Sequence, residues 1–415
     1  MDRTYSLSEY LFWRGDLSFS ASGEKDRTSV PTAPFSEVDG LILSAMSYAD
    51  FRGVDGEHVL PFPAAGIALS PGQLTEDGRK ILKTDVQQFA EQLYRTRRFS
   101  ELSLTGYVSE TDVSAEQQFA AMTFLLPDKS PVVVFRGTDE SLVGWKEDCN
   151  MSYLPSIPSQ GKAVRYLNRI AARYPGDIHV VGHSKGGNLA IFASVGADPS
   201  VRARIRNVYS YDGPGFDESF VRSDAFSGVA DRIVTFIPES SLVGGFFFRG
   251  GKTEYVLSAE RGLMQHKPLS WYAVGDRLSR ADGRSEFGKR MDDSIRNGID
   301  TVPKEDRREF VELLFQLLGA TKAETLGQLT GTGLGSLLAL RNSYRNFDRE
   351  TRQRFRQLFL RITALQREPK EKKTGLISDR EQKKNGMPEE SAGETMSIPE
   401  GLAVVSGRTE TEDKR

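Results

Sequence analysis

The segment Gly182-His-Ser-Lys-Gly186 places a serine at the centre of a short turn flanked by glycines. An apolar, β-rich run precedes it over 178–181, and small residues suited to a helix follow it over 185–195. On a sharp turn from a strand into a helix the serine backbone is strained, and side chains two residues to either side would collide. The pattern predicts that Ser184 lies on such a turn, with its hydroxyl exposed as a nucleophile.

Strand-like and helical segments alternate around this turn. Strands are predicted over 119–126, 132–135, 178–181, 208–211, 233–237 and 255–257, and helices over 36–48, 85–97, 161–174 and 185–195. The first two strands are separated by a proline-flanked turn, which predicts a hairpin. Several strands are apolar without alternation, as strands buried on both faces are. This order predicts the α/β-hydrolase fold, a mainly parallel sheet with helices on both faces.

The predicted sheet accounts for only part of the chain. We expect an N-terminal arm with marginal structure at 1–35, the α/β-hydrolase domain at 36–282, a helical region at 283–367 and a disordered tail at 368–415. Four helices are predicted in the helical region, near 284–299, 303–319, 323–342 and 347–366. The tail has too few large apolar residues to offset the entropy of ordering it.

Composition excludes several classes of partner. The charges of the 55 basic and 57 acidic residues nearly cancel, so we expect no nucleic-acid partner.

The one cysteine, Cys149, follows Lys-Glu-Asp, and neighbouring carboxylates raise a thiol pKa, so it is interpreted as an inert packed residue. No apolar leader and no run of about 18 apolar residues is visible, which predicts a soluble, cytoplasmic protein without a transmembrane segment. No metal or organic cofactor is expected.

A serine nucleophile needs a base. The chain contains four histidines. His58 lies in a polar loop, His179 lies within the strand before the turn, and His183 neighbours Ser184 in a position that cannot easily turn back to its hydroxyl. His266 remains, and it follows the serine in chain order as the base does in this fold.

The acid that orients the base must lie between Ser184 and His266 in the chain. Asp212 ends a predicted strand and precedes Gly-Pro-Gly, so its carboxylate can reach a loop histidine and fix its tautomer. We favour Asp212, with a turn-stabilising role as the alternative interpretation of this residue. Glu239, after the next strand, is the second candidate for the acid.

An oxyanion hole requires backbone donors aimed at the developing negative charge. One expected donor is the N–H of Lys185, directly after the nucleophile. The other is expected in the loop after an earlier strand, where Phe135-Arg-Gly-Thr138 makes Thr138 the candidate. A simple turn is the alternative interpretation of that loop.

These motifs resemble known families. Phe135-Arg-Gly-Thr-Asp upstream of Gly-His-Ser-Lys-Gly-Gly is similar to the class 3 lipases, and pancreatic-type lipases carry their acid in Asp-Pro-Ala, which Asp212-Gly-Pro resembles. Class 3 lipases place the acid in Asp-x-Val-Pro, where this chain reads Ser241-Leu-Val-Gly. Residues 36 to about 275 of this chain resemble the bacterial Mbeg-like family of α/β-hydrolase-like proteins. Its marks here are Val38-Asp-Gly-Leu-Ile-Leu-Ser44, 135–148, the turn, 211–216, 240–244 and Gln265-His266.

The leading hypothesis is a serine hydrolase of the lipase/esterase type, acting on carboxylic, lipid-like esters with Ser184, His266 and Asp212 as its triad. The lipid-like substrate rests on the resemblance and on the aromatic run 246–248, which has a core role as its alternative. A thioesterase or peptidase would use the same machinery, and a non-catalytic binding or scaffold protein would retain the turn without activity. Peripheral membrane contact is one interpretation of the glycine-containing segment 326–340.

Overall fold

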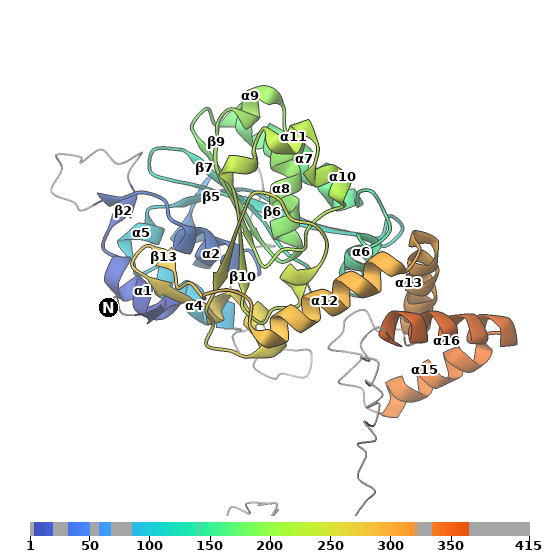
Figure 1. Ribbon diagram of the computed structural model, residues 1–415. Coiled ribbons are helices and arrows are strands. Elements are labelled where there is room, and N and C mark those ends of the chain that lie inside the picture. Colours follow the sequence, from blue (N-terminus) through green and yellow to red (C-terminus); the bar gives the residue numbers. More distant parts are fainter. Residues whose placement is uncertain are drawn as a thin grey trace, which may run out of the picture. The chain divides into compact units, whose positions relative to one another are not determined.

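The computed structural model describes residues 4–19, 32–49, 58–67, 85–139, 141–319, 321 and 334–364, all within one compact unit, Met1–Glu368. Within them, eight strands form the main sheet in the order β11-β10-β9-β8-β7-β6-β5-β4 (Figure 1). The strands are β4 (Leu60–Pro61), β5 (Ser103–Asp112), β6 (Gln117–Leu125), β7 (Pro131–Phe135), β8 (Ile178–His183), β9 (Ile205–Tyr211), β10 (Ile233–Pro238) and β11 (Lys252–Val256). Strands β7 to β11 are parallel, and β4 to β7 pair antiparallel.

The predicted hairpin is confirmed, and it has a third strand beside it. Strands β6 and β7 pair antiparallel with Leu125 opposite Pro131. Strand β5, which the sequence analysis did not predict, pairs with β6. Its apolar residues are interrupted by Gly106 at φ 68°, where the register shifts, and its second half is polar and exposed. The period-2 pattern is therefore broken at the glycine.

Helices cover both faces of the sheet (Figure 1). Helix α2 (Glu37–Met46) packs on one face, and α7 (Pro158–Arg173) and α8 (Lys185–Gly196) pack on the other. Along β7, Val132 and Val134 belong to the apolar cluster on the α2 side, and Val133 and Phe135 to the cluster on the α8 side. Burial on both faces explains the absence of alternation. The chain has the α/β-hydrolase fold, as the sequence predicts.

The expectation of marginal structure in the N-terminal arm is wrong for residues 4–19. Helix α1 (Leu7–Arg14) begins with a capping box, and β1 (Tyr5–Ser6) pairs with β12 (Tyr272–Val274). Three apolar side chains of α1 are buried in the core on the α2 side: Leu7, Tyr10 and Leu11. Their spacing puts them on one helix face, and the polar residues between them hide this pattern in the sequence.

The helical region contains the predicted helices α12 (Glu286–Thr301), α13 (Lys304–Gly319), α15 (Leu334–Asn346) and α16 (Arg349–Ala364). Helices α13 and α16 are joined by ion pairs from Arg354 to Asp306 and Glu309, and by a stack of Phe310 on Phe355. The first part of the predicted helix 323–342, up to 333, and the predicted disordered tail lie outside the described residues. The domain boundaries at 35, 282 and 367 stay predictions.

Shorter elements complete the described chain. The other helices are α3 (Phe62–Ile67), α4 (Asp85–Leu93), α5 (Arg97–Ser100), α6 (Leu142–Asn150), α9 (Pro199–Arg202), α10 (Glu218–Val221), α11 (Asp224–Ser227), η1 (Ala230–Arg232), η2 (Val243–Gly245), η3 (Gly262–His266) and η4 (Pro268–Ser270). The other strands are β2 (Ser18–Phe19), β3 (Thr32–Ala33) and β13 (Arg277–Leu278). Among the described helices, none has the length and apolarity needed to cross a membrane.

Candidate active site

Ser184 sits between β8 and α8 with φ 59° and ψ −131°, a conformation that L-residues rarely adopt. The flanking glycines allow it. A Cβ added to Gly182 would lie 2.1 Å from the carbonyl oxygen of Gly186, and one added to Gly186 would lie 2.1 Å from that of Phe135. Strand β7, strand β8 and helix α8 therefore meet here with no room for side chains, and the serine side chain is left partly exposed.

His266 and Asp212 are in direct contact. His266, at the end of η3, places Nδ1 2.6 Å from Oδ2 of Asp212, which follows β9. The Asp212 carboxylate is fully buried and also accepts hydrogen bonds from the Ser241 hydroxyl at 2.5 Å and the Gly244 N–H at 3.0 Å. These three donors replace the hydrogen bonds to water that the carboxylate loses on burial. This contact orients Nδ1 toward the carboxylate, so in the neutral ring that donates from Nδ1 the other nitrogen, Nε2, is the one that can accept a proton.

Ser241 stands where the resemblance to class 3 lipases would place the acid. Instead of carrying the charge, it donates its hydroxyl to Asp212. Asp212, after strand β9, thus carries the carboxylate, and Ser241, after strand β10, is its hydrogen-bond donor. A sequence pattern alone does not reveal this pairing, because it depends on the loops after two neighbouring strands meeting in space.

His183 connects the turn to His266. Its ring lies 4.5 Å from the His266 ring, and its Nε2 lies 2.7 Å from the His266 carbonyl oxygen. A carbonyl only accepts, so Nε2 carries the proton, and Nδ1 accepts from the Tyr48 hydroxyl at 2.8 Å. Burial, with the neighbouring His266, lowers the pKa of His183 well below its usual value and keeps it neutral. His183, the residue directly before Ser184, therefore binds the His266 backbone.

The hydroxyl of Ser184 and His266 make no direct hydrogen bond in the described part of the chain. In enzymes without substrate this contact is commonly long, and it tightens when substrate binds. The remaining histidines lie elsewhere: His179 packs against Phe35, and His58 is exposed.

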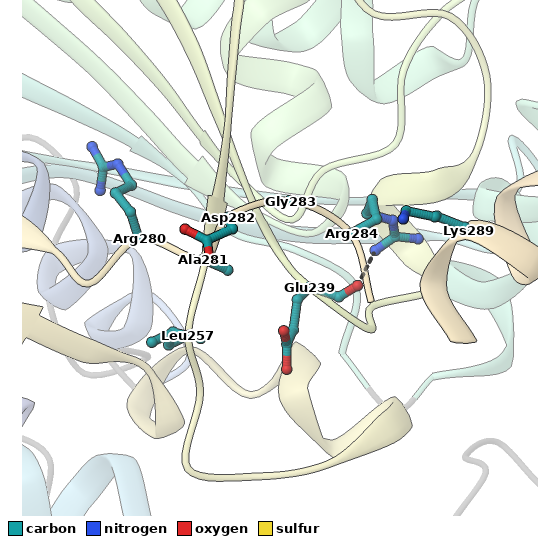
Figure 2. Close-up of a pocket in the computed structure, with 8 residues that line it drawn as sticks. All are labelled: Glu239, Leu257, Arg280, Ala281, Asp282, Gly283, Arg284 and Lys289. Carbon is teal, nitrogen blue, oxygen red and sulfur yellow. Dashed lines mark hydrogen bonds between the residues drawn. The ribbon is translucent and has the colours of Figure 1, made fainter. Parts of the chain in front are cut away.

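Glu239, the second candidate for the acid, lies in a different place. Figure 2 shows it in a pocket that is also lined by Arg280, Arg284 and Lys289. Its main-chain oxygen accepts from Arg284 at 3.4 Å, and no hydrogen bond joins its carboxylate to His266 within the described residues.

The two expected oxyanion donors lie on either side of the serine. A Cβ on Gly137 would lie 2.9 Å from the Cβ of Ser184, so the loop that carries Thr138 runs directly against the turn. Lys185 is the first residue of α8. Its N–H is one of those at a helix start that lack an acceptor within the helix, where the helix dipole favours negative charge.

Asp148, on α6, is a site residue that the sequence analysis did not single out. Its Oδ2 accepts a 2.6 Å hydrogen bond from the Thr138 hydroxyl, and its buried Oδ1 has no hydrogen-bond partner in the described chain. Burial raises the pKa of Asp148 to about 6, against the opposing effects of Lys185 and Thr138. Burial and this carboxylate raise the pKa of the neighbouring Cys149 to about 12, the direction that the expectation of an inert thiol requires. The sequence signal that could have indicated this residue is the pair of carboxylates Glu147-Asp148 within a segment, 142–150, in which about half of the residues are apolar.

The family model described as Mbeg1-like matches residues 93–316, more than half of the chain. The chain belongs to the Mbeg1-like family. The match starts at residue 93, later than the expected residue 36, and it ends in α13. The expectation that the resemblance stops near residue 275, before the helical region, is therefore wrong for the first part of that region.

Two solved structures are similar to this Mbeg1-like chain. The M37 lipase is 15% identical, with a TM-score of 0.34, covering 51% of this chain and 70% of its own. A triacylglycerol lipase from Penicillium expansum is 14% identical, with a TM-score of 0.28, covering 45% and 84%. No curated protein matches the sequence. Within the described residues, no group of three or more His, Cys, Asp or Glu is placed to hold a metal ion.

The raised pKa of Asp148 predicts a pH-dependent stability cost. The carboxyl ionises near pH 4 when unfolded but near pH 6 when folded, so stability is lost as pH rises between these values. Asp148→Asn removes the cost, and its free energy of unfolding relative to wild type should rise from pH 4 to pH 7 by up to about 3 kcal/mol. Urea titrations at several pH values measure this, and a difference that is constant with pH would contradict it.

Proposed function

We propose that the protein is a serine hydrolase that cleaves carboxylic esters through an acyl-enzyme on Ser184. The observation that carries the proposal is the 2.6 Å contact between His266 and Asp212. The His266 backbone is in turn bound by His183, the residue before the strained Ser184. Acyl transfer requires a histidine whose tautomer is fixed by a buried carboxylate and which can reach the hydroxyl of a serine, and this arrangement supports the proposal.

In the proposed reaction, His266 Nε2 takes the hydroxyl proton of Ser184 as Oγ attacks the acyl carbonyl. Asp212 stabilises the imidazolium that forms. The main-chain N–H groups of Thr138 and Lys185 bind the oxyanion, and each such donor contributes roughly 10²–10³ in kcat. The imidazolium then protonates the leaving alcohol, and water activated by His266 releases the acid.

A lipid-like acyl group is the substrate class that we propose. Gly244, which donates to Asp212, is followed closely by the aromatic run 246–248, and the Phe248 side chain is 41% exposed. The main chain of Phe248 pairs with Phe216, so the end of the run lies beside the loop that follows Asp212, and Phe247 before it bends the chain at φ 62°. Partly exposed phenyl rings near the loops that hold Asp212 suit an acyl chain, since they offer it apolar surface.

Peripheral membrane contact belongs to the same proposal. In α15 and α16, arginines outnumber carboxylates seven to one. Three large apolar side chains on these helices are about half exposed: Leu338, Phe359 and Leu360. Exposed apolar groups among positive charges suit a surface of anionic lipids.

A fluorophosphonate probe tests the proposal, since it reacts only with an activated serine. Wild-type protein should be labelled, and Ser184→Ala should not be. Ser227→Ala, an exposed serine at the end of α11, is the matched control and should be labelled like wild type. Folded wild-type protein that stays unlabelled would instead support the non-catalytic binding or scaffold protein.

The acid is tested by comparing two isosteric variants. Asp212→Asn removes the charge that fixes the His266 tautomer, so kcat should fall by roughly 10³–10⁴ while the fold is kept. Glu239→Gln, outside the contact with His266, should retain kcat within a factor of two. Steady-state kinetics on a chromogenic ester measure both, and full activity of Asp212→Asn would refute this assignment.

A panel of acyl donors tests the substrate class. Activity should rise with chain length from acetyl to about dodecanoyl esters, and esters should exceed matched thioesters and anilides in kcat/KM. A long-chain ester should be cleaved faster in vesicles that contain phosphatidylglycerol than in neutral phosphatidylcholine vesicles. A preference for acetyl esters would count against the lipid-like acyl group, and a preference for thioesters or anilides would indicate a thioesterase or a peptidase.

A further inference from the structure

The side chain of Lys185 is buried directly behind the turn, although lysine is seldom buried completely. It is 1% exposed, and its ammonium group is surrounded by oxygens. Nζ donates to Oε2 of Glu147 at 2.8 Å, to the main-chain oxygen of Gln118 at 2.8 Å and to Oε1 of Gln118 at 3.0 Å. All three ammonium protons are therefore in use, so the group acts as an anchor and not as a proton donor to substrate.

Glu147 is just as firmly held. Its side chain is fully buried, and its Oε2 also accepts the main-chain N–H of Gln118 at 3.0 Å. Its Oε1 accepts the N–H of Ser159, in the first turn of α7, at 3.0 Å, where the helix dipole favours a negative charge. The carboxylate thus ties together α6, β6 and the start of α7, and Lys185 adds the start of α8.

This ion pair connects the two sides of the candidate oxyanion hole. Lys185 carries one donor on its own main chain. Glu147 is followed by Asp148, which accepts the hydroxyl of Thr138, the residue that carries the other donor. Lys185 Nζ also lies 4.0 Å from Oδ1 of Asp148. The path from one N–H to the other therefore runs through two adjacent residues of a single helix, α6.

We propose that the Lys185–Glu147 ion pair is a positioning device that fixes the distance between the N–H groups of Lys185 and Thr138, so that the oxyanion hole is formed before substrate binds. This rests on the proposed function. Two buried charges lose much hydration, and apolar residues of similar size often give equal or greater stability. Charged hydrogen bonds are directional, however, and hold geometry that an apolar contact leaves free to slide. Stability alone thus does not account for a lysine here.

The test replaces both charges together. Lys185→Met/Glu147→Gln keeps the approximate shapes of both side chains and removes the two members of the ion pair together. With a chromogenic ester, kcat should fall at least tenfold while KM stays within a factor of two, because the hole binds the transition state and not the ground state. Glu147→Asp, which keeps both charges but shortens the link by one methylene, should lose less, and it serves as the second variant if the first does not fold.

The matched control is a second fully buried ion pair among the described residues, Arg98–Asp39, joined at 2.6 Å. Its side chains lie among Tyr10, Ser36 and Pro34, and within the described residues they make no hydrogen bond to Ser184, Asp212 or His266. Arg98→Met/Asp39→Asn removes equal charge and should keep kcat within a factor of two. If this control loses as much kcat as Lys185→Met/Glu147→Gln, or if the latter keeps its kcat, the positioning role is overturned.

A second readout does not depend on activity. Crystal structures of wild type and Lys185→Met/Glu147→Gln should differ in the separation of the main-chain nitrogens of Thr138 and Lys185, and in the Thr138–Asp148 hydrogen bond. Unchanged positions would overturn the inference even if kcat falls. If the wild type neither labels nor hydrolyses, the proposed function fails, and these structures alone decide whether the ion pair sets the spacing.

Discussion

The close approach of β7, β8 and α8 at the glycines of the turn is the constraint on which the site depends. The glycine contacts bring the main chain of Phe135, at the end of β7, against the start of α8. The strained backbone of Ser184 persists because the packed sheet and helix leave it no other path. Thr138, Ser184 and Asp212 then follow three adjacent parallel strands, β7, β8 and β9, whose carboxyl ends share one edge of the sheet.

Two carboxylates of the candidate site differ in their surroundings, since Asp212 is fully buried and the Asp148 side chain is 23% exposed. Asp212 accepts three hydrogen bonds and is fully satisfied. Asp148 binds the Thr138 hydroxyl but leaves one oxygen without a hydrogen bond, and burial raises its pKa to about 6. The first arrangement stabilises the native state while it orients His266. The second costs stability near neutral pH, which is the kind of cost that functional sites carry.

The predictions succeeded where a single local pattern was decisive. The glycine spacing around Ser184, the proline-flanked hairpin and the apolar runs of β8 and β10 each report a backbone requirement through neighbouring residues. They failed where the pattern was interrupted. In α1 the apolar face is spread among polar residues, and in β5 the bulge at Gly106 breaks the alternation. Both segments owe their order to packing against distant parts of the chain, such as β12 for the N-terminus.

The sequence by itself determined the fold class and the strained turn, because glycine sterics and the period of apolar residues act over a few neighbouring positions. It also narrowed the base to His266 by elimination. Only the tertiary structure brought His266 onto Asp212 instead of Glu239, placed Ser241 as a donor to that carboxylate, and buried Lys185 against Glu147. These contacts join residues 25 or more positions apart, and their partners are chosen by which loops meet at the edge of the sheet.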